Sequence, residues 1–189
     1  MARIRKGKKE KRKIFILVEG ETEQKYFDFL RQKLRLSNVK IKTVVLENSG
    51  QTWVEKAKRM IQNDPSYKRD STTEVFVVFD KDEFSNIELE KMFKKAIDEA
   101  FEIGFSNKSF EVWLLAHFEK VTSRVLSKTT LKNKLGNYLE TQYVKADSDQ
   151  LEKIVKNYDV AISNSKGICY VDFNHQSTNI GELILKIMS

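Results

Sequence analysis

The chain has 189 residues, of which 40% are hydrophobic, so it can build the core of one domain but leaves little room for two. Its formal net charge is +7, and no stretch approaches 18 uncharged apolar residues, which excludes a transmembrane helix. The basic N-terminus lacks the apolar segment of a secretory signal, and the single cysteine, Cys169, excludes an internal disulfide and a cysteine-rich zinc site. We therefore expect a cytoplasmic protein without a membrane segment.

The positive charge is concentrated at the N-terminus. Residues 1–13 carry eight of the 34 basic side chains and one of the 27 acidic ones. The remaining 26 of each sign cancel over residues 14–189. Blocks of like charge are typically disordered and often bind polyanions. We predict a disordered basic arm over residues 1–13 that contacts nucleic-acid phosphates in a salt-dependent manner, the alternatives being a solubilising tail or an expression artefact. The basic residues are Arg3, Arg5, Lys6, Lys8, Lys9, Lys11, Arg12 and Lys13.

The first half of the chain alternates predicted strands and helices. The run at 14–18 is short, continuous and apolar, which indicates a fully buried strand, and the segment at 39–46 indicates a second strand. Between them, apolar residues over 26–34 recur at helical spacing. A helix that presents apolar residues over 53–61, with Thr52 as its N-cap, follows the second strand.

The second half begins with another fully buried strand, at 75–79. Ser85 and Glu88 have the spacing of a capping box, which predicts a helix start, and Gly104 marks the predicted end of that helix. Residues 105–107 are predicted to be a short link or a short strand. The remaining predicted elements are a buried helix at 110–118, amphipathic helices at 127–142 and 148–163, and a terminal helix at 178–188.

This alternation predicts an α/β fold: a mostly parallel, Rossmann-like sheet flanked by helices, with a helical C-terminal part. We expect residues 14–189 to form a single domain. In open parallel sheets, ligands bind beyond the carboxyl ends of the strands, so residues at those ends are the first candidates for a functional site.

Acidic residues follow the two strongly apolar strands at the point where each strand ends. Glu19 directly follows the first, and Asp80 and Asp82 follow the later one. If these strands are neighbours, their carboxylates converge at one edge of the sheet, where mutual repulsion favours a divalent cation such as Mg²⁺ or Mn²⁺. We expect Glu23, four residues after Glu19, to face the same edge. Each cluster alone is also compatible with exposed acids near a helix N-terminus, but the two clusters together favour the metal site.

Further candidate residues lie outside the acidic clusters. Glu111, near the start of the buried helix, is a candidate catalytic pocket residue or a partner of the helix dipole. Lys145 and Lys166, at helix edges in the second half, are candidate catalytic cations. Asn107 is predicted to orient a phosphate or a metal-bound water, or to cap the helix that follows. His117 is more typical of a hydrogen-bonded core histidine than of a catalytic one.

Several segments resemble a known family. The glutamate after the first strand and the later Asp-x-Asp are similar to the toprim arrangement of topoisomerases, bacterial primases and OLD-type nucleases. More narrowly, residues 14–188 resemble the RloB-like family. The segments that carry this resemblance are Glu19-Gly20-Glu21-Thr22-Glu23, Val78-Phe79-Asp80-Lys81-Asp82-Glu83-Phe84, Ser106-Asn107 with the apolar helix at 110–118, and Ser177-Thr178-Asn179. Lys108 departs from the family pattern, which has proline after Ser-Asn.

The resemblance implies a toprim-like domain and an Mg²⁺- or Mn²⁺-dependent nuclease that cleaves phosphodiester bonds in nucleic acid. In that arrangement Glu19 is a metal ligand or the general base, Asp80 and Asp82 hold the ion, and Glu23 completes a second site. It also implies phage defence beside an ATPase of the ABC or AAA kind. This chain has no phosphate-binding loop, so ATP hydrolysis would have to come from that partner. The alternative is a non-catalytic adaptor, or a sensor that binds a nucleotide or nucleic acid. A homo-oligomer is compatible with either function.

Overall fold

Five strands form one sheet in the computed structural model, which describes residues 12–43, 53–82 and 84–189. Within these residues, the strands are β1 (Lys13–Val18), β2 (Val39–Thr43), β3 (Thr73–Asp80), β4 (Phe101–Asn107) and β5 (Ser177–Thr178). The helices in the same ranges are α1 (Glu21–Lys33), α2 (Trp53–Asn63), α3 (Asn86–Asp98), α4 (Glu111–Ala116), α5 (Lys128–Leu139), α6 (Ser148–Val155), α7 (Tyr158–Ser165) and α8 (Ile180–Met188), with short 3-10 helices η2 (Pro65–Tyr67) and η3 (Lys166–Ile168).

The strand order is β2-β1-β3-β4-β5, in which the first four strands are parallel and β5 is antiparallel to β4. β1 lies between β2 and β3, so the strands that follow it in sequence add on opposite sides of it. Such a reversal is the topological switch point of a doubly wound sheet, where ligands bind beyond the carboxyl ends. The predicted α/β fold with a mostly parallel sheet and a helical C-terminal part is confirmed.

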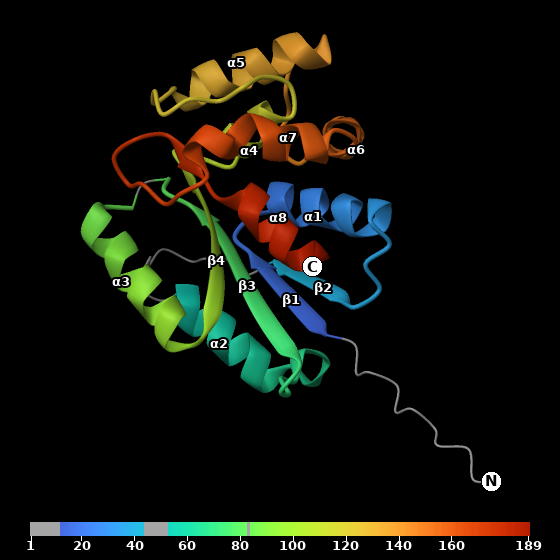
Figure 1. The fold of residues 1–189 in the computed structure, drawn as a ribbon, viewed down its shortest axis with the longest axis vertical. Helices are drawn as coiled ribbons and strands as arrows, with labels where there is room; N and C mark the ends of the chain where they lie inside the picture. The colour runs from blue at the N-terminus through green and yellow to red at the C-terminus, as the bar shows by residue number, and fades with distance from the viewer. Residues whose placement is uncertain (1–11, 44–52, 83) are drawn as a thin grey trace, which may run out of the picture.

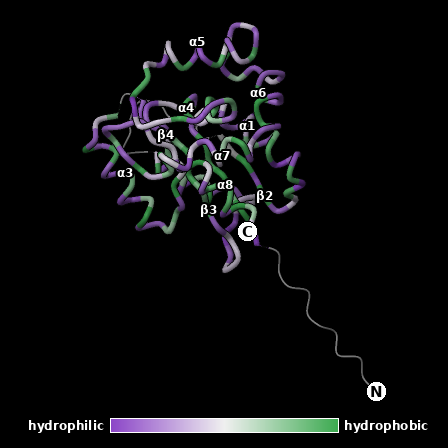
Figure 2. The backbone as a smooth tube through the Cα atoms, turned by 45° about the horizontal axis from the view of Figure 1, so that its top comes forward, coloured by the Kyte–Doolittle hydropathy of each residue, from purple (hydrophilic) through white to green (hydrophobic). Residues whose placement is uncertain are grey.

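Alternate residues of β1 enter two separate cores, one on each face of the sheet. Ile14, Ile16 and Val18 pack with α1 and the C-terminal helices, whereas Phe15 and Leu17 pack with α2 and α3. Figure 1 shows the two groups of helices on opposite sides of the strands, and Figure 2 shows hydrophobic segments concentrated along β3 and its neighbours. Because both faces are covered, the strands are apolar on both sides, which explains their uninterrupted apolar runs.

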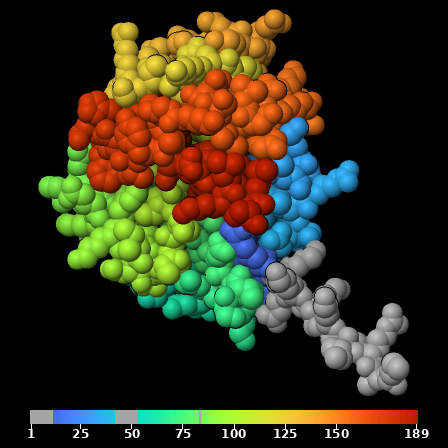
Figure 3. Space-filling view, viewed as in Figure 1, coloured from blue at the N-terminus to red at the C-terminus, as the bar shows by residue number. Residues whose placement is uncertain are grey.

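The C-terminal helices are organised around α4, all six residues of which are buried. This helix contacts α5 and α7, while α6 contacts α1. Figure 1 shows α5 as the outermost helix of this group, and Figure 3 shows residues of the yellow-to-orange range covering that end of the molecule. Among the described residues, no helix is both long and apolar enough to cross a membrane.

The segment from 101 to 107 differs from its prediction. It forms the full strand β4, whereas the sequence predicted a helix ending at Gly104 and a short element after it. α3 has already ended, and the chain turns at Ala100, whose φ is 54°. Gly104 lies inside the strand because α8 crosses close to it: a Cβ at this position would stand 2.5 Å from Leu183 Cδ1.

Two predicted C-terminal elements also differ. The predicted helix at 148–163 is two helices, α6 and α7, because their buried residues pack against different neighbours, α1 and α4 respectively. Thr178, predicted to begin the terminal helix, instead belongs to β5, where it pairs with Ser106. The buried helix predicted at 110–118 and the amphipathic helix predicted at 127–142 are confirmed, with shorter bounds.

Most of the predicted basic arm, residues 1–11, lies outside the described residues. Arg12 and Lys13, which were counted with it, belong to the folded domain. The Arg12 guanidinium binds the Glu74 carboxylate and donates to the Lys186 carbonyl oxygen at 2.7 Å. Lys13 begins β1 and forms an ion pair with Asp70. These ion pairs bind the two residues to the amino end of the sheet, which corrects the predicted boundary.

Candidate functional site

The acidic residues predicted to converge do so at the switch point. β1 pairs with β3 in a register that places Val18 beside Val78, so the carboxyl ends of both strands meet. Glu19 follows β1, and Asp80 ends β3. Six acidic residues from three stretches of the chain line one pocket of about 380 Å³ together with Lys145; they are Glu19, Glu21, Glu23, Asp80, Asp82 and Glu111.

Glu19 and Asp80 are direct neighbours at the centre of this pocket. The Asp80 backbone N–H lies 3.5 Å from Glu19 Oε2, and the Phe110 N–H donates to Asp80 Oδ2 at 3.3 Å. Burial, together with the negative charges of Glu23 and Asp82, raises the pKa of Glu19 to about 7. Burial and the adjacent Glu19 charge likewise raise the pKa of Asp80 well above its usual value. The structure thus holds acids together in a state that a positive ion would stabilise.

Glu23 reaches the pocket from the first turn of α1, as expected. Its side chain is buried, and its pKa is raised mainly by this burial and to a smaller extent by the negative charge of Glu111. Gly20 makes room for it, because a Cβ at that position would stand 2.6 Å from Glu23 Oε2. The glycine of the Glu-Gly-Glu-Thr-Glu segment therefore serves a close approach between backbone and carboxylate.

Lys145 enters the pocket from the loop between α5 and α6. Its Nζ lies 3.6 Å from Glu111 Oε1, and Glu111 itself is only 3% exposed. Two residues of α1 hold this loop: Thr22 Oγ1 accepts from the Ala146 N–H at 3.1 Å, and Lys25 Nζ donates to the Ala146 carbonyl at 2.8 Å. The structural role of Thr22 was missed from the sequence, because its partner lies 124 residues away.

Asp82 occupies a tight loop after β3. Its φ of 34° lies in the left-handed region, which aspartate tolerates better than most residues, and its backbone N–H donates to the Lys108 carbonyl at 3.2 Å. The peptide bond between Asn107 and Lys108 is cis. The Asp82 carboxylate forms an ion pair with Lys128, the first residue of α5. Sequence analysis missed Lys128, because no local pattern links residues 46 positions apart.

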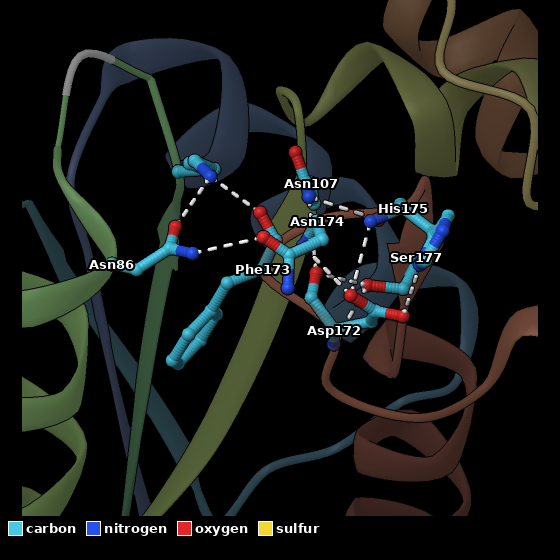
Figure 4. Close-up of polar contacts among 8 residues, drawn as sticks. Asn86, Asn107, Asp172, Phe173, Asn174, His175 and Ser177 are labelled. Carbon is cyan, nitrogen blue, oxygen red and sulfur yellow. Dashed lines mark hydrogen bonds and ion pairs between the residues drawn. The ribbon is translucent and has the colours of Figure 1, made fainter.

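Asn107, predicted to orient a phosphate or a metal-bound water or to cap the next helix, holds the loop before β5. It is 3% exposed, and its side-chain amide donates to the Asp172 carbonyl at 3.0 Å and to the His175 carbonyl at 2.8 Å. Figure 4 shows Asn107 and Asn86 contacting this loop. From the Asp-x-Asp segment, the Lys81 ammonium joins the same network through Asn86 and the backbone of residue 173. Through Lys81, the network connects the Asp-x-Asp segment to the loop before β5.

Two other candidates lie apart from the acids. Lys166 begins η3, is exposed, and is not among the residues that line the acidic pocket. His117 is 2% exposed, and its Nε2 lies 3.0 Å from the Tyr26 hydroxyl. Burial lowers the pKa of His117 to about 4, so it is neutral at physiological pH. The interpretation of His117 as a core histidine is confirmed.

The donor chemistry of the pocket fits a hard divalent cation, since carboxylate oxygens are the preferred ligands of Mg²⁺. Among the described residues, however, no three Asp, Glu, His or Cys side chains already form a group that could hold a metal ion. The ion pairs of Asp82 with Lys128 and of Glu111 with Lys145 engage two of the acids. Binding of an ion therefore requires these side chains to move.

Together, the fold and the pocket define an α/β protein whose doubly wound sheet carries a carboxylate cluster at its switch point. The model of the RloB-like protein family matches residues 14–187, nearly the whole chain. The chain belongs to the RloB-like family. No curated protein and no solved structure matches it.

Proposed function

We propose that this chain is a metal-dependent nuclease that cleaves phosphodiester bonds in nucleic acid. The observation that carries the proposal is the meeting of Glu19 and Asp80 at the switch point, with Glu23, Asp82 and Glu111 around them. Such a cluster has one sign of charge and oxygen ligands only, which suits Mg²⁺ or Mn²⁺. The sequence resemblance to toprim nucleases supports the same chemistry.

In this mechanism Glu19, Asp80 and Asp82 hold the ion, and Glu23 and Glu111 are available for a second one. A divalent cation held there would supply Lewis-acid stabilisation of the charge that develops on the phosphoryl group. In the alternative arrangement Asp80 and Asp82 alone would hold the ion, and Glu19 would accept a proton from the attacking water as the general base. Lys145, more than half exposed at the rim, contacts a phosphate oxygen of the substrate and stabilises its negative charge.

We extend the proposal to the setting in which the nuclease acts. Residues 1–11 carry six basic side chains and contact the substrate backbone. An ATPase of the ABC or AAA kind acts beside the chain in phage defence. Co-expression of tagged chain with candidate ATPases of the ABC and AAA kinds, followed by affinity purification, tests this partnership; a stable complex supports it, and recovery of the chain alone at physiological salt contradicts it.

The nuclease proposal is tested by metal binding and cleavage together. Wild type and Asp80→Asn are melted in EDTA and over a Mn²⁺ titration, because an ion that binds only the folded state raises its melting temperature. We expect stabilisation of wild type that Asp80→Asn lacks. Cleavage of single-stranded and duplex DNA and RNA, and of tRNA, should fall about 100-fold or more in the variant, since even indirect metal ligands cost about 10- to 100-fold.

Glu90→Gln is the matched control, because Glu90 is an exposed acid of α3 that does not line the pocket. It should retain both the stabilisation by Mn²⁺ and the cleavage. Absence of Mn²⁺ stabilisation in wild type would remove the metal site and favour the adaptor alternative. Cleavage that survives in Asp80→Asn would show that the nuclease activity resides elsewhere.

A further inference from the structure

Lys128 places a positive charge beside Asp82, one of the acids that line the pocket. It is the first residue of α5, whose start is fixed by Ser127, the side chain of which accepts from the Thr130 N–H. From there the Lys128 ammonium forms its ion pair with the Asp82 carboxylate. Its charge also reaches Glu19, whose pKa it lowers, although burial outweighs this effect. The lysine therefore acts on two of the acids assigned to the ion.

The Lys128 ammonium binds the Asp82 carboxylate oxygen that a divalent cation would need as a ligand. A carboxylate cluster in a partly enclosed site requires positive charge nearby, because like charges that share a site repel one another. An ammonium supplies one charge, whereas a divalent cation supplies two and binds several oxygens at once. Lysine has a long, flexible side chain, and that of Lys128 is 33% exposed, so its head group can move into water when the ion arrives.

We propose that Lys128 is an internal counterion of the acidic pocket: it holds Asp82 in the ion-free protein and is exchanged for the divalent cation on binding. The proposal rests on the proposed function, since it concerns the same metal site. It accounts for the engagement of Asp82, one of the six acids that line the pocket, with an ammonium in place of an ion. A purely structural role of Lys128 predicts the opposite result, because loss of the side chain would then weaken metal binding.

The test measures Mn²⁺ affinity directly, from the electron paramagnetic resonance signal of free Mn²⁺ in titrations of the full chain. Lys128→Gln removes the competing charge, and we expect it to bind Mn²⁺ about five- to tenfold more tightly than wild type, because the ion no longer has to displace an ammonium from the Asp82 carboxylate. Lys128→Arg keeps the charge and should stay within about twofold of wild type.

The matched control is Lys132→Gln, which removes the same charge one turn further along α5. Lys132 is exposed and does not line the acidic pocket, so its variant should bind Mn²⁺ like wild type. Lys128→Met, which keeps the apolar stem, replaces Lys128→Gln if the latter does not unfold cooperatively in EDTA. Tight binding by Lys128→Gln when wild type binds weakly or not at all supports the exchange.

The remaining outcomes separate this inference from the proposed function. If wild type binds Mn²⁺ and Lys128→Gln binds equally or less tightly, the exchange is wrong while the metal site stands. If neither wild type nor any Lys128 variant binds Mn²⁺, both the exchange and the proposed metal site are wrong. If Lys132→Gln gains as much affinity as Lys128→Gln, the gain reflects net charge, and the specific role of Lys128 is wrong.

Discussion

At the scale of single residues, the fold holds carboxyl groups close together although their charges repel one another. Glu19 lies against the backbone of Asp80, and Glu23 occupies the space that the absent side chain of Gly20 leaves. Burial and the neighbouring carboxylates raise the pKa of Glu19, Glu23 and Asp80, so holding all three groups ionised destabilises the fold. The acidic pocket therefore lowers the stability of the fold, which is a common property of functional sites.

The raised pKa of these carboxyl groups predicts that the stability of the protein in EDTA depends on pH. Because the pKa of Glu19 is raised from 4.5 to about 7, the folded chain keeps a proton between these values that the unfolded chain releases. The free energy of unfolding should therefore fall as pH rises from about 5 to 7, by up to about 3 kcal/mol from Glu19 alone. Glu19→Gln, which stays neutral, should show a flatter profile and exceed wild type in stability near pH 7.5.

Urea unfolding at a series of pH values measures this difference, with Glu90→Gln as an exposed control that should follow wild type. A wild-type free energy that stays level or rises between about pH 5 and 7, or a Glu19→Gln profile parallel to it, contradicts the assignment of a raised pKa to Glu19.

At the scale of elements, the C-terminal helix α8 packs on β4, the strand that was not predicted from the sequence. α8 packs on β4 through Gly104, where a Cβ would stand 2.5 Å from Leu183 Cδ1 and 3.0 Å from Ile180 Cδ1. β5 extends the same edge, and Asn179 fixes the helix start: its side chain accepts from the Phe105 N–H at 2.6 Å. The chain from β4 to α8 is thus one packing unit.

We expect Gly104→Val to destabilise the protein by about 2 to 3 kcal/mol, because a larger side chain in a filled core forces its neighbours to shift. The control is Gly167→Ala, since a Cβ at Gly167 meets no atom within 4 Å and should change the stability by less than about 0.5 kcal/mol. Thermal and urea unfolding of both variants measure the difference. Equal stability of the two variants would mean that α8 does not pack closely on β4.

At the scale of the whole molecule, the two groups of charges lie at opposite ends of the sheet. The carboxylates line the carboxyl ends of β1 and β3, whereas Arg12 and Lys13 lie at the amino end of β1 and are held by Glu74 and Asp70. The chain beyond residue 13 carries no net charge, so non-specific attraction for a polyanion comes mainly from residues 1–11.

Removal of residues 1–11 should therefore weaken nucleic-acid binding and its salt dependence, but leave the melting temperature unchanged. With six basic residues lost, the slope of log K against log salt should decrease by at most about 5. Fluorescence anisotropy with a Ca²⁺-loaded, non-cleaving mixture measures both quantities. A full-length chain with those six residues replaced by glutamine should behave like the truncated one; an unchanged slope in both would exclude nucleic-acid contact by the arm.

The sequence by itself determined the two buried strands β1 and β3, because their apolar runs are local, and it determined which acids follow them. It also determined the family, through segments that are contiguous in the chain. Only the tertiary structure decided that β1 and β3 are neighbours, that β4 is a strand, and that Lys128 pairs with Asp82. Contacts of this kind join residues 46 to 124 positions apart and depend on packing, to which local periodicity is blind.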